Sequence, residues 1–172
     1  RWLSSESFCS WQGVECDRSG HVKGIRLQQN SVRGEFPDLH ALTHLEQLVV
    51  SHNEIEGPLP SLARLRRLVS VRLADNKLSG ELGSVLPPLL QTLDLRNNQL
   101  TGTLPDLSTA PRLFEVNLAD NHFEGGLPAL PHGLRELYLE HNLLRGELPQ
   151  LLPPHLEFLR IAFNNMTGAL PV

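Results

Sequence analysis

The chain has 172 residues, of which 40% are hydrophobic and 20% charged, and its formal net charge is -4 with neutral histidines. These values predict one folded domain rather than a disordered tail. The chain has 15 Lys and Arg against 19 Asp and Glu. It therefore has no excess of basic residues to bind a phosphate backbone, and nucleic acid is not an expected partner. No run of 18 apolar residues occurs, so we expect no membrane contact by this segment.

The two ends of the chain indicate an excerpt from a longer protein. It begins with Arg1 rather than Met and stops at Val172 in the middle of a pattern. Missing targeting signals are then uninformative. An anchor or further repeats after residue 172 are compatible with this pattern.

From residue 22 onward the chain is a repeat. Seven asparagines recur at intervals of 23, 23, 22, 23, 21 and 22 residues, each with aliphatic residues eight, five and three positions before it. A glycine stands four positions after each asparagine, and Phe or Leu follows two positions later. The asparagines are Asn30, Asn53, Asn76, Asn98, Asn121, Asn142 and Asn164. Self-similarity at this period indicates a stacked architecture.

The spacing within each repeat predicts a short strand that ends near the asparagine. Leu93 and Leu95, for example, are separated by one residue, so both point to the same side of a strand. A unit of about 22 residues cannot bury its apolar side alone, and stacked copies bury a continuous core instead. The asparagine amide can satisfy backbone groups of the turn, and the later glycine permits a bend.

The pattern resembles the leucine-rich repeat, and its LxGxLP stretch resembles the plant-type extracellular class, which includes receptor ectodomains and inhibitor proteins. The stretch occurs in NKLSGEL at 76–82, NQLTGTLP at 98–105 and NMTGALP at 165–171. Surface leucine-rich repeat proteins of protists are also similar. The resemblance implies an α/β-type solenoid, mostly β and turns, right-handed, with a parallel inner sheet and an outer strand per repeat. Seven repeats would occupy residues 22–172, truncated at the C-terminal end.

Residues 1–21 do not fit the repeat and contain both cysteines, in the stretch FCSWQGVEC. A solenoid has to cover the open end of its core. This segment resembles the N-terminal cap of plant-type leucine-rich repeat proteins, in which W-x-G-V-x-C follows a first cysteine. The resemblance implies a disulfide between Cys9 and Cys16, with Trp11 packed over the first repeat.

Two further expectations follow for the cap. Trp2 and Leu3 would continue its hydrophobic cover. Two reduced, buried thiols are the alternative to the disulfide. A disulfide implies an oxidising compartment, so we expect a secreted or cell-surface protein.

The opposite side of each repeat is rich in proline. Segments such as PALPHGL (128–134) and PQLLPPHL (149–156) leave little room for a convex helix. Turns, polyproline II or short 3₁₀ segments are expected there.

No catalytic or metal-binding pattern is found. The chain has no GxSxG, P-loop, GxGxxG or HExxH motif, and its eight histidines are scattered without a nearby Cys or carboxylate to complete a ligand set. His40 and His44 have the spacing of one helix face, and we interpret them, like His21, as surface residues. We therefore expect no enzyme, no cofactor and no metal.

Asn165-Met166-Thr167 is an N-x-T sequence. It falls in the expected loop between an inner and an outer strand. Such sites are often glycosylated in the family that the chain resembles, and an unmodified, exposed Asn165 is the alternative.

The outward side chains of the inner strands form columns along the concave face. Arginines make the first half basic, acidic residues follow, and the last two repeats carry aromatic residues. Tyr and Arg with aromatic neighbours are typical of binding hot spots. The candidate ligand-binding residues are Arg72, Arg96, Glu115, Tyr138, Glu140, Phe158 and Arg160. Alternatively, Phe158 and Phe163 pack against a following repeat or cap.

These patterns favour an extracellular recognition module that binds a protein, peptide or glycan on its concave face, as part of a receptor or surface protein. Three alternatives remain. The chain could inhibit a secreted enzyme, as some plant-type proteins do. It could build a cell wall, coat or surface filament through its solenoid edges. It could also be the sensing part of a modular enzyme.

Overall fold

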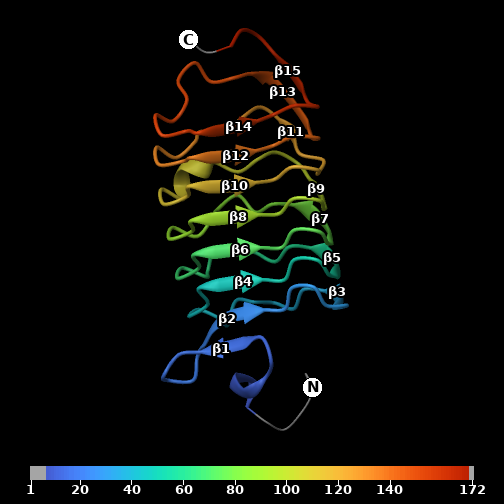
Figure 1. Ribbon diagram of the computed structural model, residues 1–172, viewed down its shortest axis with the longest axis vertical. Helices are drawn as coiled ribbons and strands as arrows, with labels where there is room; N and C mark the ends of the chain where they lie inside the picture. Colours follow the sequence, from blue (N-terminus) through green and yellow to red (C-terminus); the bar gives the residue numbers. More distant parts are fainter. Residues whose placement is uncertain (1–6, 171–172) are drawn as a thin grey trace.

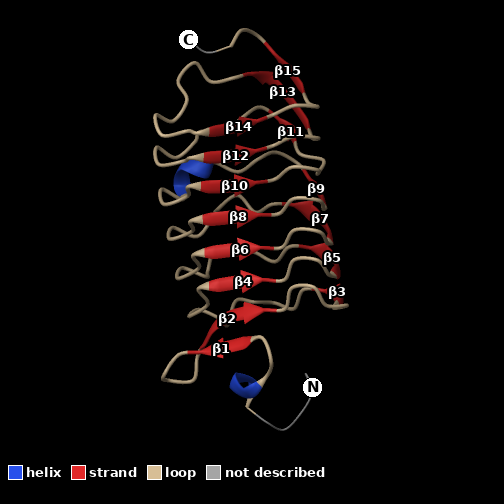
Figure 2. Ribbon diagram, in the orientation of Figure 1, coloured by secondary structure: helices blue, strands red, loops and turns tan. Residues whose placement is uncertain are grey.

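The computed structural model describes residues 7–170, and they form a solenoid of stacked coils (Figure 1). The chain climbs from the N-terminal coil at one end of the long axis to the C-terminal coil at the other. Short strands lie on two sides of the stack, and loops connect them (Figure 2). Trp2 and Leu3, expected to cover the first repeat, lie outside the described residues.

One strand of each coil joins the inner sheet, which lines the concave face. Neighbouring strands pair in parallel without a register shift, so equivalent repeat positions lie side by side. The strands are β2 (Val22–Arg26), β4 (Gln47–Val49), β6 (Ser70–Arg72), β8 (Thr92–Asp94), β10 (Glu115–Asn117), β12 (Glu136–Tyr138) and β14 (Phe158–Arg160). The parallel inner sheet expected from the repeat is therefore confirmed.

A second strand of each coil lies on the outer side, in sheets of four and three strands. Among the described residues, a parallel bridge between Thr103 and Glu124 links the two sheets. A glycine in or just after each strand has φ between +77° and +93°, a region in which L side chains are strained. The strands are β3 (Arg33–Glu35), β5 (Glu54–Pro58), β7 (Lys77–Glu81), β9 (Gln99–Thr101), β11 (Glu124–Gly125), β13 (Leu143–Glu147) and β15 (Asn165–Thr167).

Leucine side chains fill the space between the two sheets. The central residue of each middle inner strand, such as Leu93 or Val116, is fully buried, because its side chain points away from the concave face. Its counterparts in the first and last repeats, Ile25 and Leu159, are only half-buried. The core is thus continuous through the stack and thins at both ends.

The cap extends the inner sheet by one antiparallel strand. It consists of a 3₁₀ turn, η1 (Phe8–Ser10), and β1 (Val14–Cys16), which pairs with β2. A disulfide joins Cys9 to Cys16, so the pairing implied by the resemblance is the one observed. The Cys9–Cys16 bridge fastens the turn to the strand that covers the first repeat.

The convex side is built from turns, with one further 3₁₀ segment among the described residues, η2 (Leu107–Thr109). Asp106 caps it by accepting a hydrogen bond from the Ser108 amide at 2.9 Å. Prolines along this side remove backbone donors and fix φ, which explains why the α-helix that a longer repeat could carry is missing here.

The repeat asparagines connect successive coils through their side-chain amides. The Asn98 Oδ1 accepts the Leu78 backbone amide at 3.0 Å, and its Nδ2 donates to the Leu73 carbonyl at 3.1 Å, both in the preceding coil. The same Nδ2 also lies 3.0 Å from the Leu95 carbonyl of its own coil. Six of the seven asparagines repeat this pattern, whereas within residues 7–170 Asn30 donates to two carbonyls of its own coil.

The residue before each repeat asparagine has an unexpected backbone conformation. All seven have φ between +52° and +57°, the left-handed region that Asn, Asp and His tolerate better than other non-glycine residues. These residues are Gln29, His52, Asp75, Asn97, Asp120, His141 and Phe163. Five of them are Asn, Asp or His, a composition signal for the turn that sequence analysis did not use.

Replacing Asn98 by alanine should destabilise the solenoid. The variant leaves the buried Leu78 amide and Leu73 carbonyl without these partners, at a cost of about 1–3 kcal/mol in the free energy of unfolding. Gln99→Ala, at an exposed position one residue along, should cost less than about 0.5 kcal/mol. Urea denaturation followed by circular dichroism measures both, and equal losses would contradict the asparagine assignment.

Candidate functional site

The inner sheet presents its outward side chains on the concave face in strict register. Glu136 of β12 lies opposite Phe158 of β14, and Tyr138 lies opposite Arg160. These positions are about 4.8 Å apart across a sheet. Two residues from each of two neighbouring coils therefore form a compact block near the C-terminal end.

We call five residues of this end of the concave face the Tyr138 cluster: Glu136, Tyr138, Glu140, Phe158 and Arg160. The Tyr138 hydroxyl donates a hydrogen bond to Glu136 Oε2 at 2.9 Å. The Arg160 guanidinium lies over the tyrosine ring, 5.5 Å from its centroid, a cation–π arrangement. Phe158 is 48% exposed. Sequence analysis named Tyr138, Glu140, Phe158 and Arg160 as candidates, and the structure brings these four residues together.

Glu140 is more enclosed than Arg160, the charged residue beside it. Its side chain is 20% exposed, and its Oε1 lies 3.9 Å from Arg160 Nη1. Its second oxygen, Oε2, is buried and has no hydrogen-bond partner among the described residues. A buried carboxylate oxygen without a partner is costly, and a ligand reaches this atom only if the Glu140 side chain turns.

A second aromatic surface lies beside this cluster. Phe163 is 73% exposed and its ring stacks on His141 with centroids 4.2 Å apart and planes at 9°. Both residues adopt positive φ, so the left-handed turns place these two side chains in one column. The stack widens the exposed apolar area that adjoins the Tyr138 cluster.

The remaining candidate residues lie further toward the N-terminus and compensate one another's charge. Arg72 Nη2 is 3.9 Å from Glu115 Oε2, two strands away. Arg96 Nε is 4.0 Å from Asp94 Oδ1. Burial raises the pKa of Asp94, and the charge of Arg96 opposes this rise. The expected basic half of the face is therefore largely balanced by acidic neighbours, and Arg72, Arg96 and Glu115 stand apart from the Tyr138 cluster.

The glycosylation sequence was expected in a loop, but it lies in an outer strand, β15. Asn165 is the first residue of β15 and pairs in register with Arg145 of β13. The loop expected at Asn165 is absent because strand β15 begins directly after the repeat asparagine Asn164. The side chain of Asn165 remains exposed, which is the condition that modification requires.

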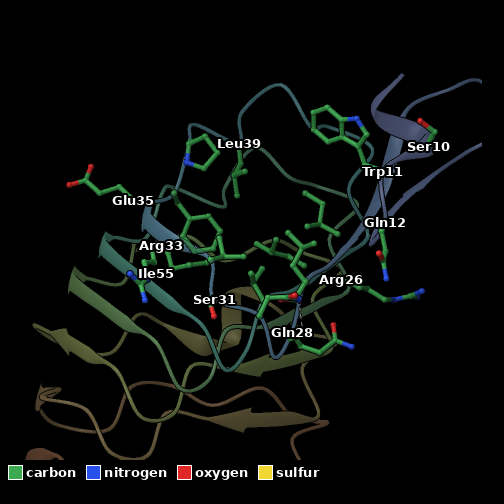
Figure 3. Close-up of a pocket in the computed structure, with 18 residues that line it drawn as sticks. Ser10, Trp11, Gln12, Arg26, Gln28, Ser31, Arg33, Glu35, Leu39 and Ile55 are labelled. Carbon is green, nitrogen blue, oxygen red and sulfur yellow. Dashed lines mark hydrogen bonds between the residues drawn. The ribbon is translucent and has the colours of Figure 1, made fainter. Parts of the chain in front are cut away.

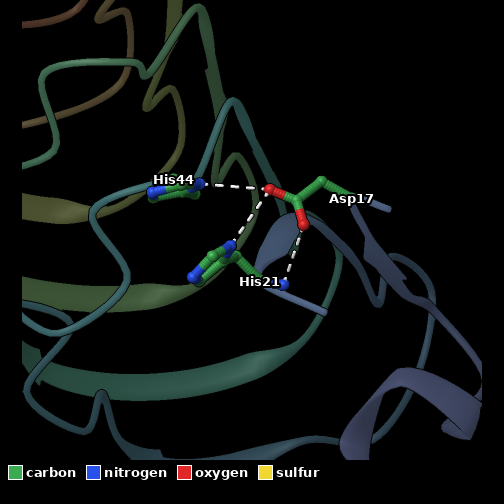
Figure 4. A group of neighbouring side chains, drawn as sticks. All are labelled: Asp17, His21 and His44. Atoms are coloured by element: carbon green, nitrogen blue, oxygen red, sulfur yellow. Dashed lines mark hydrogen bonds and ion pairs between the residues drawn. The ribbon is translucent and has the colours of Figure 1, made fainter. Parts of the chain in front are cut away.

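The prediction that no carboxylate lies near the histidines is wrong. Asp17 Oδ2 is 3.3 Å from His21 Nδ1 and 3.1 Å from His44 Nδ1 (Figure 4). Asp17 and His44 are 27 residues apart, and folding places the cap loop against the convex turn of the second coil. Sequence spacing alone could not reveal this contact.

An open cavity of about 1220 Å³ is lined by residues of the cap and of the first coils. Trp11 borders it from the cap, and Leu39 and Ile55 border it from the repeats (Figure 3). The half-buried Trp11 thus faces the end of the leucine core. This cavity lies at the opposite end of the solenoid from the Tyr138 cluster.

Comparison with known proteins identifies the repeat. The description "Leucine Rich Repeat" matches residues 89–109 and 133–154, and "Leucine Rich repeat" matches residues 41–58. A "Receptor-like protein kinase" of Ipomoea nil is 44% identical over 50 residues. The aligned segment spans 28% of this chain and only 4% of that relative.

Solved structures resemble the chain over most of its length. Pollen Receptor Kinase 3 matches with a TM-score of 0.79 and 28% identity over 98% of this chain and 86% of its own. The BIR3–SERK2 complex from Arabidopsis thaliana gives 0.72 and 30%, over 81% and 79%. The Arabidopsis receptor kinase HAESA, in complex with the peptide hormone IDA and the co-receptor SERK1, gives 0.62 and 28%, over 85% and 30%. In residues 7–170 no helix has the length and apolar character to cross a bilayer.

The single tyrosine of the chain offers a direct test of the Tyr138 cluster. Partial burial raises the pKa of Tyr138 above its ordinary value of 10.0, and the hydrogen bond to Glu136 adds to the rise. An alkaline absorbance titration should place the phenol pKa above 10.0 in the folded protein. Glu136→Gln should lower that pKa, because the anionic acceptor is lost. Glu124→Gln on the outer sheet should leave it unchanged, and an equal effect of both variants would contradict the contact.

Proposed function

Because the chain belongs to the leucine-rich repeat family and resembles plant receptor-kinase ectodomains, we propose that it is a recognition module of a secreted or cell-surface protein. Its partner is a protein or peptide that binds along the concave face. The contact centres on the Tyr138 cluster. The proposal covers this segment only.

The observation that carries the proposal is the composition of the Tyr138 cluster. Tyr138 and Phe158 supply aromatic area at a low cost in side-chain entropy. Arg160, exposed over most of its side chain, can pair with a carboxylate. Glu140, whose Oε1 lies 3.9 Å from Arg160 Nη1, adds a carboxylate that can accept a hydrogen bond from the same ligand. A peptide offers carboxylates, amides and apolar side chains together, which suits this combination.

The comparisons support a protein or peptide partner. HAESA is similar to this chain and is described in complex with a peptide hormone and a co-receptor. BIR3 and SERK2 are described in a complex with each other. The Cys9–Cys16 disulfide supports an oxidising, extracellular location.

We further propose that the segment binds rather than catalyses. No spacing in the sequence pairs a Ser or Cys nucleophile with both a histidine and an acid. A glycan remains the alternative ligand, because Tyr138 and Phe158 can also stack on sugar rings. An assembly role through the solenoid edges would use the outer strands instead.

Alanine at Tyr138 should weaken binding of a concave-face ligand. The 172-residue chain is first screened against a library of synthetic peptides with the sequences of secreted peptides. A glycan array is screened in parallel. Isothermal titration of a peptide hit should then show a loss of about 2 kcal/mol or more for Tyr138→Ala. Gln99→Ala on outer strand β9 should bind like the unmodified chain.

Three results would contradict parts of this proposal. Hits on the glycan array alone would replace the peptide by a sugar ligand. Normal peptide binding by Tyr138→Ala with lost binding by Gln99→Ala would move the site to the outer face. Concentration-dependent self-association, seen by sedimentation and lost in outer-strand variants, would favour the structural role.

A further inference from the structure

Three metal-ligating side chains converge where the cap meets the second coil. Asp17 and His21 lie at the two ends of the turn between β1 and β2, and His44 lies in the convex turn before β4. Both imidazole Nδ1 atoms point at the same carboxylate oxygen, Asp17 Oδ2, at 3.3 and 3.1 Å (Figure 4). All three ligand atoms lie within 4.8 Å of one another.

The distances suit a small tetrahedral ion. Zinc binds histidine nitrogen at about 2.0–2.1 Å and carboxylate oxygen at about 2.0–2.2 Å. Two ligands of a tetrahedral ion at such bond lengths are roughly 3.3–3.5 Å apart. The observed separations of 3.3 and 3.1 Å need only a small expansion. An ion would take the place of the protons that the imidazoles now direct at Asp17.

The carboxylate is fixed in position for this role. Its other oxygen, Oδ1, accepts the backbone amides of Ser19 at 2.8 Å and His21 at 3.0 Å. The His21 amide is the largest cause that lowers the pKa of Asp17, and the histidine side chains lower it further. Asp17 is therefore ionised at neutral pH, with Oδ2 directed at the two rings.

The two rings are also held in place. They stack with centroids 4.0 Å apart and planes at 29°, which keeps both Nδ1 atoms on one side. The side chains of Asp17 and His44 are each 29% exposed, and that of His21 is 53% exposed. An ion can therefore enter from solvent and keep a water molecule as its fourth ligand.

We propose that Asp17, His21 and His44 form a binding site for Zn²⁺ that ties the cap to the second coil. Two imidazole nitrogens and one carboxylate favour zinc over Mg²⁺ or Ca²⁺, which prefer oxygen ligands. The disulfide joins two residues within the cap. The metal instead joins Asp17 of the cap to His44 of the second coil, which is 27 residues away in the sequence. Zinc binding then stabilises the N-terminal end of the solenoid.

Arg67 is the charged neighbour that opposes the site. Its Nη1 lies 3.4 Å from His44 Nδ1, so its guanidinium has to move away before this nitrogen can bind a cation. Removal of that positive charge lowers the repulsion. Arg67→Gln should therefore bind zinc more tightly than the unmodified chain.

Isothermal titration of ZnCl₂ into the 172-residue chain, with any purification histidine tag removed, tests the proposal. One ion per chain is expected, and MgCl₂ should give no comparable heat. His44→Gln and Asp17→Asn should each weaken zinc binding about 10-fold or more, because even residues that only support a ligand contribute 10–100-fold. The control is His122→Gln, on the fifth coil, which should bind zinc normally.

Thermal melting provides the second measurement. A metal that binds the folded state raises Tm as its concentration exceeds Kd, so at a given zinc concentration Tm should rise less for His44→Gln than for the unmodified chain and for His122→Gln. The proposal is overturned if zinc fails to bind the unmodified chain. It is also overturned if His44→Gln and His122→Gln bind zinc equally, because the ion then sits elsewhere. Weaker binding by Arg67→Gln would contradict the role given to the guanidinium.

Discussion

The structure depends on a hydrogen-bonded connection that six of the seven repeat asparagines make between two coils. One amide side chain accepts a backbone N–H of the preceding coil and donates to carbonyls of both coils, as Asn98 does with Leu78, Leu73 and Leu95. The chain has to leave the inner strand sharply at this point, and its polar backbone enters the apolar interior. Without the amide, the buried backbone groups would lack partners.

This constraint fixes the concave face. Because each coil is tied to the one before it, residues about 22 positions apart stand next to each other in the same column. Tyr138 and Arg160 meet in this way, as do Glu136 and Phe158. A binding surface is thus assembled from side chains that are distant in sequence, on a sheet whose register cannot slip without breaking the asparagine contacts.

The periodic part of the structure could be predicted from sequence, since it follows from spacing. The positions of the aliphatic residues, such as Leu93 and Leu95, predict the inner strands, and the cap was predicted by resemblance around Cys9 and Cys16. Four members of the Tyr138 cluster could be named because they occupy outward positions of neighbouring repeats, whereas Glu136, which accepts a hydrogen bond from the Tyr138 hydroxyl, was not among the candidates.

Other features depend on geometry that spacing does not encode. The left-handed residue before each asparagine is visible only as an excess of Asn, Asp and His. Asp17 meets His44 because a loop of the cap folds against a convex turn, and neither belongs to the repeat. The pairing of Arg72 with Glu115 spans two strands, farther than a column argument between nearest neighbours considers. Asn165 was placed in a loop because β15 begins directly after the repeat asparagine Asn164.

Residue-resolved hydrogen exchange tests most directly whether the asparagines hold the coils together. The backbone amides of Leu78, Leu100 and Phe123 donate to the side chains of Asn98, Asn121 and Asn142. They should exchange as slowly as amides of the inner strands, because they open only with the coil. Exchange at the rate of exposed convex turns, while the inner strands stay protected, would contradict the central role of the asparagines.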